Sequence, residues 1–158
     1  MKKCFVLFLF ILTNSLYSQT TYSDTIYDKS IHSLQLYRTG FNLSYPIITL
    51  GNGDQLTLAF DEFGTKGNFY TYTIIHCNAD WKTSDYLKSE YVEPFTNEQI
   101  TNITYSNNTL KDYVHYEVSF PNDNIKILKS GNYIVSVYSE NEEEPLFTKK
   151  FYVAEATP

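Results

Sequence analysis

Three nearby residues, His76, Cys77 and Asp80, are of the types that ligate metals or act as nucleophiles. An imidazole and a thiolate at one point could hold zinc or form a Cys/His nucleophile pair. Residues 69–78, however, predict a β-strand, and neighbouring side chains of a strand point to opposite faces. We therefore expect no metal or catalytic site here. The alternative is a half-buried strand end with Cys77 as a small core residue.

The acidic residues also lack the pattern of a site. Asp61 and Glu62 are neighbours on a predicted strand and should diverge, so they do not form a hydrolase pair. Residues 140–145 carry the one charge run, which is typical of a solvated hairpin tip. The sequence contains no Cys-x-x-Cys, P-loop, Gly-x-Gly-x-x-Gly or Gly-x-Ser-x-Gly motif. We expect no enzyme activity, no metal and no cofactor.

The aromatic residues are the other candidates for function. Trp81, the single tryptophan, follows the longest predicted strand, where it either plugs a sandwich end or recognises a partner or sugar. Possible exposed aromatic area, of the kind that interfaces favour, comes from Tyr70, Tyr72, Tyr86, Tyr91, Tyr105 and Tyr113. The alternative is that alternating tyrosines line a half-solvated sheet face.

Residues 1–18 read as a secretory signal peptide, with Lys2 and Lys3 before an apolar run at 5–12 and a small residue at Ser18. The apolar run is too short for a membrane-spanning helix. Removing this segment leaves ten basic against 18 acidic residues, a net charge of −8. An acidic protein of this kind is not a general nucleic-acid binder. Cys77 would be the one remaining cysteine, so no internal disulfide is expected.

The remaining chain predicts an all-β fold, because aromatic residues make up 17% of the full sequence and period-2 segments recur between Gly, Asn and Pro turns. The expected strands are residues 31–37, 47–50, 55–60, 69–78, 101–105, 113–120, 133–138 and 146–153, with a short apolar stretch at 125–128. Gly51 to Asp54 indicates a hairpin between the second and third. The economical architecture is an immunoglobulin-like antiparallel β-sandwich of about eight strands over residues 31–154. Residues 19–30 are expected to be a flexible lead-in.

Residues 79–100 form a long connection without clear periodicity. A connection of this length is either a functional loop or a place for a short helix or an extra strand. The length of the connection and its aromatic residues make Ala79 to Phe95 the predicted partner-binding loop, with Trp81, Tyr86 and Tyr91 as anchors.

Several short motifs resemble one known family. They are Leu43-Ser44-Tyr45-Pro46-Ile47-Ile48, His76-Cys77-Asn78-Ala79-Asp80-Trp81, Ser89-Glu90-Tyr91, Phe120-Pro121-Asn122 and Lys129-Ser130-Gly131-Asn132-Tyr133. Their order and spacing resemble the N-terminal domain of the type IX secretion system plug proteins of Bacteroidota, over roughly residues 31–153. The run from His76 to Trp81 is the most specific of these motifs.

The resemblance implies a periplasmic, non-enzymatic protein associated with the outer membrane. Its partner would be the large outer-membrane translocon barrel, whose periplasmic mouth the family occludes when no cargo passes. Family members continue with a longer β-rich region, so the expectation for this sequence is a fragment, a truncated copy or a domain with a reduced role. The rival hypothesis is a carbohydrate-binding β-sandwich of the cell envelope. That rival predicts glycan-dependent quenching of Trp81 fluorescence, whereas a plug predicts none.

Overall fold

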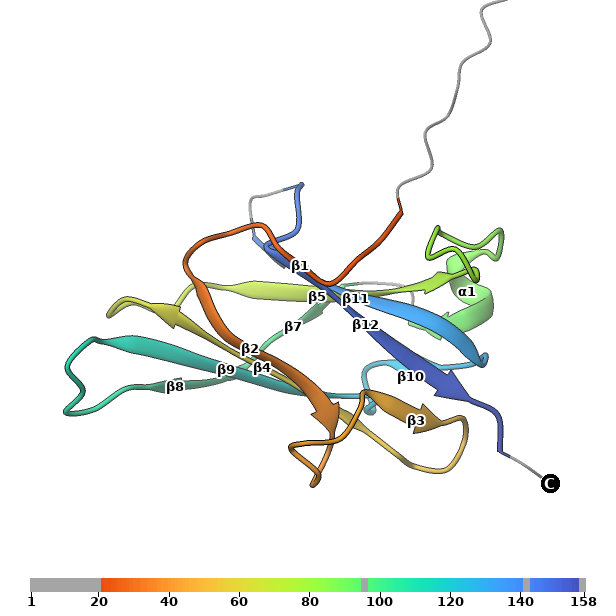
Figure 1. Ribbon diagram of the computed structural model, residues 1–158, viewed down its shortest axis with the longest axis horizontal. Coiled ribbons are helices and arrows are strands. Elements are labelled where there is room, and N and C mark those ends of the chain that lie inside the picture. The colour runs from red at the N-terminus through yellow and green to blue at the C-terminus, as the bar shows by residue number, and fades with distance from the viewer. Residues whose placement is uncertain (1–20, 95–96, 141–142, 157–158) are drawn as a thin grey trace, which may run out of the picture.

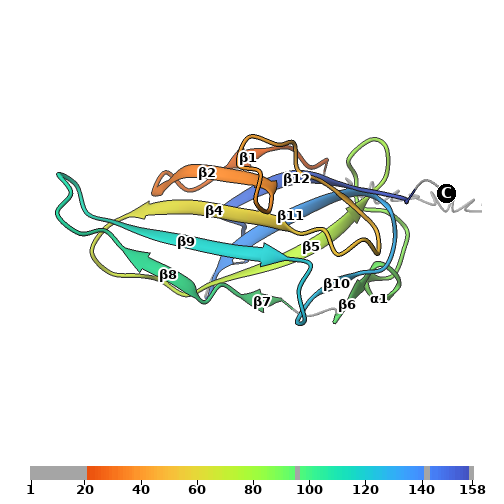
Figure 2. The ribbon, with the colours of Figure 1, turned by 90° about the horizontal axis from the view of Figure 1, so that it is seen from below.

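The computed structural model describes residues 21–94, 97–140 and 143–156 of the 158-residue chain. Two β-sheets pack face to face, with β5, β11 and β12 above β2, β4 and β9 in Figure 1. Seen from below, the β2–β4–β9–β8 sheet covers the other one (Figure 2). This arrangement confirms the all-β, immunoglobulin-like sandwich. In the described part of the chain, eight strands have three or more residues, as expected.

The larger sheet has the order β1-β12-β11-β5-β7, with β3 added in parallel to β12. Its strands are β1 (Thr25–Ile26), β3 (Ile47–Thr49), β5 (Tyr70–Cys77), β7 (Glu98–Gln99), β11 (Gly131–Ser139) and β12 (Phe147–Ala154). The second sheet contains β2 (Ile31–Arg38), β4 (Leu56–Phe63), β8 (Asn102–Tyr105) and β9 (Tyr113–Phe120). A two-stranded ribbon pairs β6 (Val92–Glu93) with β10 (Lys126–Ile127).

Aromatic side chains from both sheets form the core between them. Phe60 of β4 stacks on Tyr116 of its own sheet at a ring-centroid distance of 5.0 Å. It also meets Phe147 of β12, in the opposite sheet, edge to face at 5.0 Å. Phe60 lies in the predicted alternation with Leu56 and Leu58, and all three are fully buried. The period-2 pattern of β4 therefore identified its core face correctly.

The hairpin expected around residues 51–54 is wrong. Gly51 and Gly53 do adopt the left-handed backbone that the turn prediction requires, with φ of 73° and 76°. The turn nevertheless joins strands of different sheets, because β3 pairs with β12 and β4 pairs with β2 and β9. Turn residues specify a local reversal of the chain, while strand partners are chosen by long-range packing.

The expectation of a flexible lead-in at residues 19–30 is also wrong for residues 21–30, the part that the structure describes. Thr25 and Ile26 form β1, which pairs antiparallel with β12. Asp24 caps this edge: its carboxylate accepts a hydrogen bond from the Lys150 N–H at 2.7 Å and from the Lys149 ammonium at 2.7 Å. These contacts lie more than 120 positions apart in the sequence, so no local pattern announces them. The expected signal peptide lies outside the described residues.

The connection of residues 79–100 contains both a short helix and extra strands. Helix α1 (Lys88–Tyr91) is one turn long and leads directly into β6. Further along the connection, after the break in the described residues, β7 pairs antiparallel with β5 at the edge of the larger sheet. Val92 and Ile100 are buried, so this connection is part of the core packing rather than a free loop. The structure describes the acidic tip at residues 140–145 only in part, because Glu142 lies outside the described residues.

Candidate functional site

Trp81 sits at the corner of a tight reversal after β5. The Asn78 side chain stabilises this turn, since its oxygen accepts hydrogen bonds from the backbone N–H groups of Asp80 and Lys82 at 3.0 and 3.1 Å. Trp81 adopts a positive φ of 61°, which is unusual for a large residue. Its half-buried ring meets the Tyr152 ring edge to face, with centroids 5.5 Å apart. The turn thus places the tryptophan on the outward face of β12.

Tyr86 and Tyr91 lie elsewhere, around the imidazole of His76. Tyr86 is 48% exposed and packs edge to face on His76 at 5.2 Å. Tyr91 is only 5% exposed and contacts both His76 and Tyr133. A ring with so little accessible area cannot anchor a partner, so the expected partner-binding role of Tyr91 is corrected to a core role. The three predicted anchors do not form one cluster.

Two other tyrosines expected to add exposed area are also buried. Tyr70 and Tyr72 are 3% and 1% exposed, because β5 is an interior strand that lies between β11 and β7. Tyr105, on the edge strand β8, is the exposed member of the set besides Tyr86, at 58%. Alternating tyrosines in β5 therefore mark a core face and not a docking face.

His76 is buried inside an aromatic cage. Its ring lies 4.9 Å from the Tyr133 ring, edge to face, and its Nε2 is 3.3 Å from the Ser130 carbonyl oxygen, to which a ring N–H there donates. Its Nδ1 is buried without a hydrogen-bond partner among the described residues. Burial lowers the pKa of His76 below its ordinary value of 6.5; the Ser130 carbonyl opposes this shift, and nearby Lys129 adds to it.

This lowered pKa makes stability depend on pH. Below pH 6.5 the unfolded chain binds a proton at His76 that the folded protein resists, so the free energy of unfolding should fall as the pH drops from 7.5 to 5. Urea unfolding at these pH values measures the loss. His76→Gln should flatten that part of the profile. Parallel profiles for wild type and His76→Gln would contradict this assignment.

Cys77 is held in a different environment from its neighbour. It is 2% exposed, and burial raises the pKa of its thiol to about 11, although Lys150 counteracts this. His76 packs against Tyr91 and Tyr133 in the core, while the charged neighbour of Cys77 is Lys150, beside Trp81. The two side chains do not converge, as strand geometry predicts.

The sequence model of one protein family, described as "Type 9 secretion system plug protein 1st domain", matches residues 31–155. The match runs from the start of β2 past the end of β12, which is the whole sandwich except β1. The chain belongs to this plug-domain family. The resemblance seen in the sequence motifs is therefore confirmed.

One solved structure matches the plug domain closely. It is a hypothetical protein from Parabacteroides merdae ATCC 43184, at 34% sequence identity and a TM-score of 0.82. The match covers 85% of this chain and 34% of that chain, so the plug domain spans about a third of the length of its structural relative. A second match, an alkylpurine DNA glycosylase AlkC from Pseudomonas fluorescens, has 15% identity and a TM-score of 0.43. No curated protein matches.

The plug domain also contains an Asp–His pair that sequence reasoning missed. His115 Nδ1 lies 2.7 Å from an Asp61 carboxylate oxygen across the β4–β9 ladder. A cavity of about 340 Å³ beside the pair is also lined by Thr104 and Ser106. Ser106 Oγ accepts a hydrogen bond from the Tyr113 backbone at 2.8 Å. Among the described residues His115 has no hydrogen bond to a hydroxyl group, so the pair does not activate a nucleophile in this arrangement.

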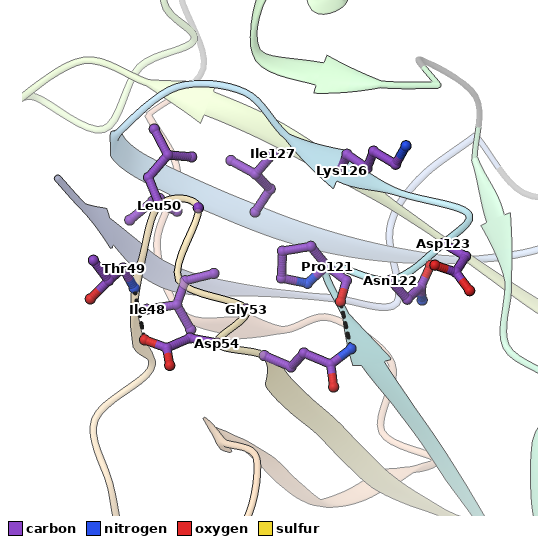
Figure 3. A pocket seen from close by; sticks show the side chains of 13 residues that line it. Ile48, Thr49, Leu50, Gly53, Asp54, Pro121, Asn122, Asp123, Lys126 and Ile127 are labelled. Carbon is purple, nitrogen blue, oxygen red and sulfur yellow. Dashed lines mark hydrogen bonds between the residues drawn. The ribbon is translucent and has the colours of Figure 1, made fainter. Parts of the chain in front are cut away.

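A further cavity of about 360 Å³ opens between the β3–β4 turn and the β9–β10 connection (Figure 3). Its apolar wall includes Leu50, Pro121 and Ile127. Asp54 at its edge binds the Thr49 N–H at 3.2 Å and the Arg38 guanidinium at 2.7 Å. Burial acts to raise the pKa of Asp54, but these two partners outweigh it and lower the pKa. The carboxylate is thus already neutralised within the fold.

Neither metal nor membrane chemistry is evident in the described residues. They contain no group of three His, Cys, Asp or Glu side chains that could hold a metal ion. No helix among them is long and apolar enough to cross a membrane.

Proposed function

We propose that this domain is a non-enzymatic part of a plug that occludes the periplasmic mouth of the type 9 outer-membrane translocon. The observation that carries the proposal is the family match over residues 31–155. A two-sheet sandwich suits a steric role, because its shape is held by a packed aromatic core rather than by a ligand. The barrel would bind the rigid wedge at its rim, and cargo would have to displace it.

The reactive residues support a role without catalysis. Burial holds the Cys77 thiol in its protonated form, with a pKa of about 11, whereas catalytic thiols have a lowered pKa. His76 is enclosed by tyrosine rings and faces a backbone carbonyl, so it is part of the packing. Each group contributes to the fold and is poorly placed for a substrate.

Two of the predicted anchors remain proposed contacts. Trp81 is half-buried and Tyr86 is 48% exposed, so each retains area that a partner can cover. A stable seal needs about 1,200–2,000 Å² of buried surface, far more than two rings supply. Additional surface must therefore take part.

The carbohydrate-binding alternative is less well supported by the geometry of Trp81. A sugar stacks on an open aromatic face, but the Lys150 ammonium lies 4.2 Å from the centroid over the Trp81 ring. The Tyr152 ring also packs against the Trp81 ring, in an edge-to-face contact. The exposed aromatic side chains of this region suit a protein partner, because aromatic residues are enriched in protein interfaces.

Crosslinking pull-down from outer-membrane extracts tests the proposal. The tagged, processed protein should capture the translocon barrel, identified by mass spectrometry, and an excess of untagged protein should compete for it. The heat-unfolded protein provides the control, since a steric plug depends on its shape. Reproducible absence of the barrel from the captured material would overturn the proposed function.

A further inference from the structure

Three exposed side chains and the half-buried ring of Trp81 lie around strands β3 and β12 of the larger sheet. They are Tyr45, Ile47, Trp81 and Tyr152, here called the Tyr152 strip. Tyr45 is 84% exposed, Ile47 is 46% exposed and Tyr152 is 42% exposed. The strip joins two of the sequence motifs, residues 43–48 and 76–81, which lie more than 25 positions apart and meet only on either side of β12.

Strand register explains why these side chains share a face. β12 pairs in parallel with β3, so that Tyr152 lies opposite Ile47 and Val153 lies opposite Ile48. Ile48 and Val153 are each 3% exposed and face the core, so their partners in the alternation face outward. The Tyr152 N–H also donates to the Pro46 carbonyl at 2.9 Å, which fixes the approach to β3.

The β2–β3 loop extends the strip with aliphatic and aromatic side chains. Leu43 is fully exposed, and Phe41 is 61% exposed. The Arg38 guanidinium lies 5.5 Å from the centroid of the Phe41 ring, and the Ser44 hydroxyl accepts the Arg38 N–H at 2.9 Å. The loop is therefore tied to β2 while its apolar side chains face solvent. Exposed apolar side chains near one another on a protein surface can mark an interaction site.

The charges around the strip indicate the kind of partner. Lys150 lies over the Trp81 ring, and Lys82 follows Trp81 in the turn. Asp80 is the exposed carboxylate of the same turn. With the adjoining Lys149–Asp24 pair included, three lysines stand against two carboxylates, so this region is more basic than a chain whose formal net charge is −6. A partner with carboxylates at the margin of an apolar surface would complement it.

We propose that the Tyr152 strip, with Leu43 beside it, is the surface through which the domain docks on its secretion partner. The partner surface is an apolar protein patch bordered by Asp or Glu side chains. This inference rests on the proposed function and specifies where the contact lies. Tyr86, which packs on His76, is not part of the strip.

A matched pair of double variants tests the location. Leu43→Ser with Tyr45→Ser removes exposed area from the strip, and Tyr105→Ser with Leu110→Ser removes similar area from the β8–β9 hairpin. That hairpin extends to the end of the sandwich opposite β3 (Figure 1). Leu43 and Leu110 are both fully exposed, so neither double variant should alter the fold. Equal melting temperatures for both double variants would verify this.

The strip variant should reduce capture of the translocon barrel about tenfold in the crosslinking pull-down, and the hairpin variant should leave it unchanged. Lys82→Glu should weaken capture more at low than at high salt, whereas Lys111→Glu should not. Failure of the wild-type protein to capture the barrel would overturn both the function and the strip. Undiminished capture by the strip variant would overturn the strip alone. If the strip variant lost binding to outer-membrane lipid vesicles but still captured the barrel, the proposed docking surface would also be overturned.

Discussion

Gly131→Ala is expected to lower the free energy of unfolding by about 3 kcal/mol or more. Gly131 opens β11 with a φ of 142°, a conformation that side chains rarely adopt. An added Cβ would lie 2.5 Å from His76 Nε2. The His76 ring cannot move aside, because Tyr86 and Tyr133 both pack against it edge to face. Urea unfolding at pH 7.5 measures the loss.

Gly64→Ala separates the two causes of this loss. Gly64 has a φ of 149°, close to that of Gly131, but a Cβ there would meet nothing within 4 Å. It should therefore cost about 1–2 kcal/mol, from the backbone alone. An equal loss in both variants would mean that the contact with His76 contributes nothing. A smaller loss for Gly131→Ala in a His76→Ser background would identify the imidazole as the obstacle.

Phe60→Ala should have a comparable or larger effect, about 3–5 kcal/mol. Phe60 is fully buried and connects the two sheets, with Phe147 and Tyr70 as its contacts in the opposite sheet. Removing its ring leaves a cavity that the backbone of two sheets cannot close. Thermal and urea unfolding report the change.

Phe69→Ala is the matched control for Phe60→Ala. Phe69 has the same side chain but is 61% exposed, just before β5. It should change the free energy of unfolding by no more than about 0.5 kcal/mol. Similar losses for the two variants would show that the interface between the sheets does not depend on Phe60.

The predicted anchors show where sequence reasoning reaches its limit. Trp81 is a predicted partner-binding anchor after β5, and the turn that holds it is local, because Asn78 accepts hydrogen bonds from residues within four positions of itself. Tyr91 looked equally available, because nothing nearby in the sequence indicates the His76 and Tyr133 rings that cover it. Tyr152 was passed over, since its importance comes only from the neighbours that β3 and the 78–82 turn place beside it.

The period-2 alternation and the turn residues of the amino-acid chain were enough to establish the all-β class, the positions of the main strands and the buried face of β4. These properties depend on residues a few positions apart, whose side-chain directions follow from backbone geometry. The motifs were enough to identify the plug-domain family. Only the folded molecule decided that β3 joins β12, that β1 pairs with the same strand, and that Ile47 and Trp81 lie beside Tyr152. Such pairings depend on the packing of segments far apart in the chain, which local preference does not specify.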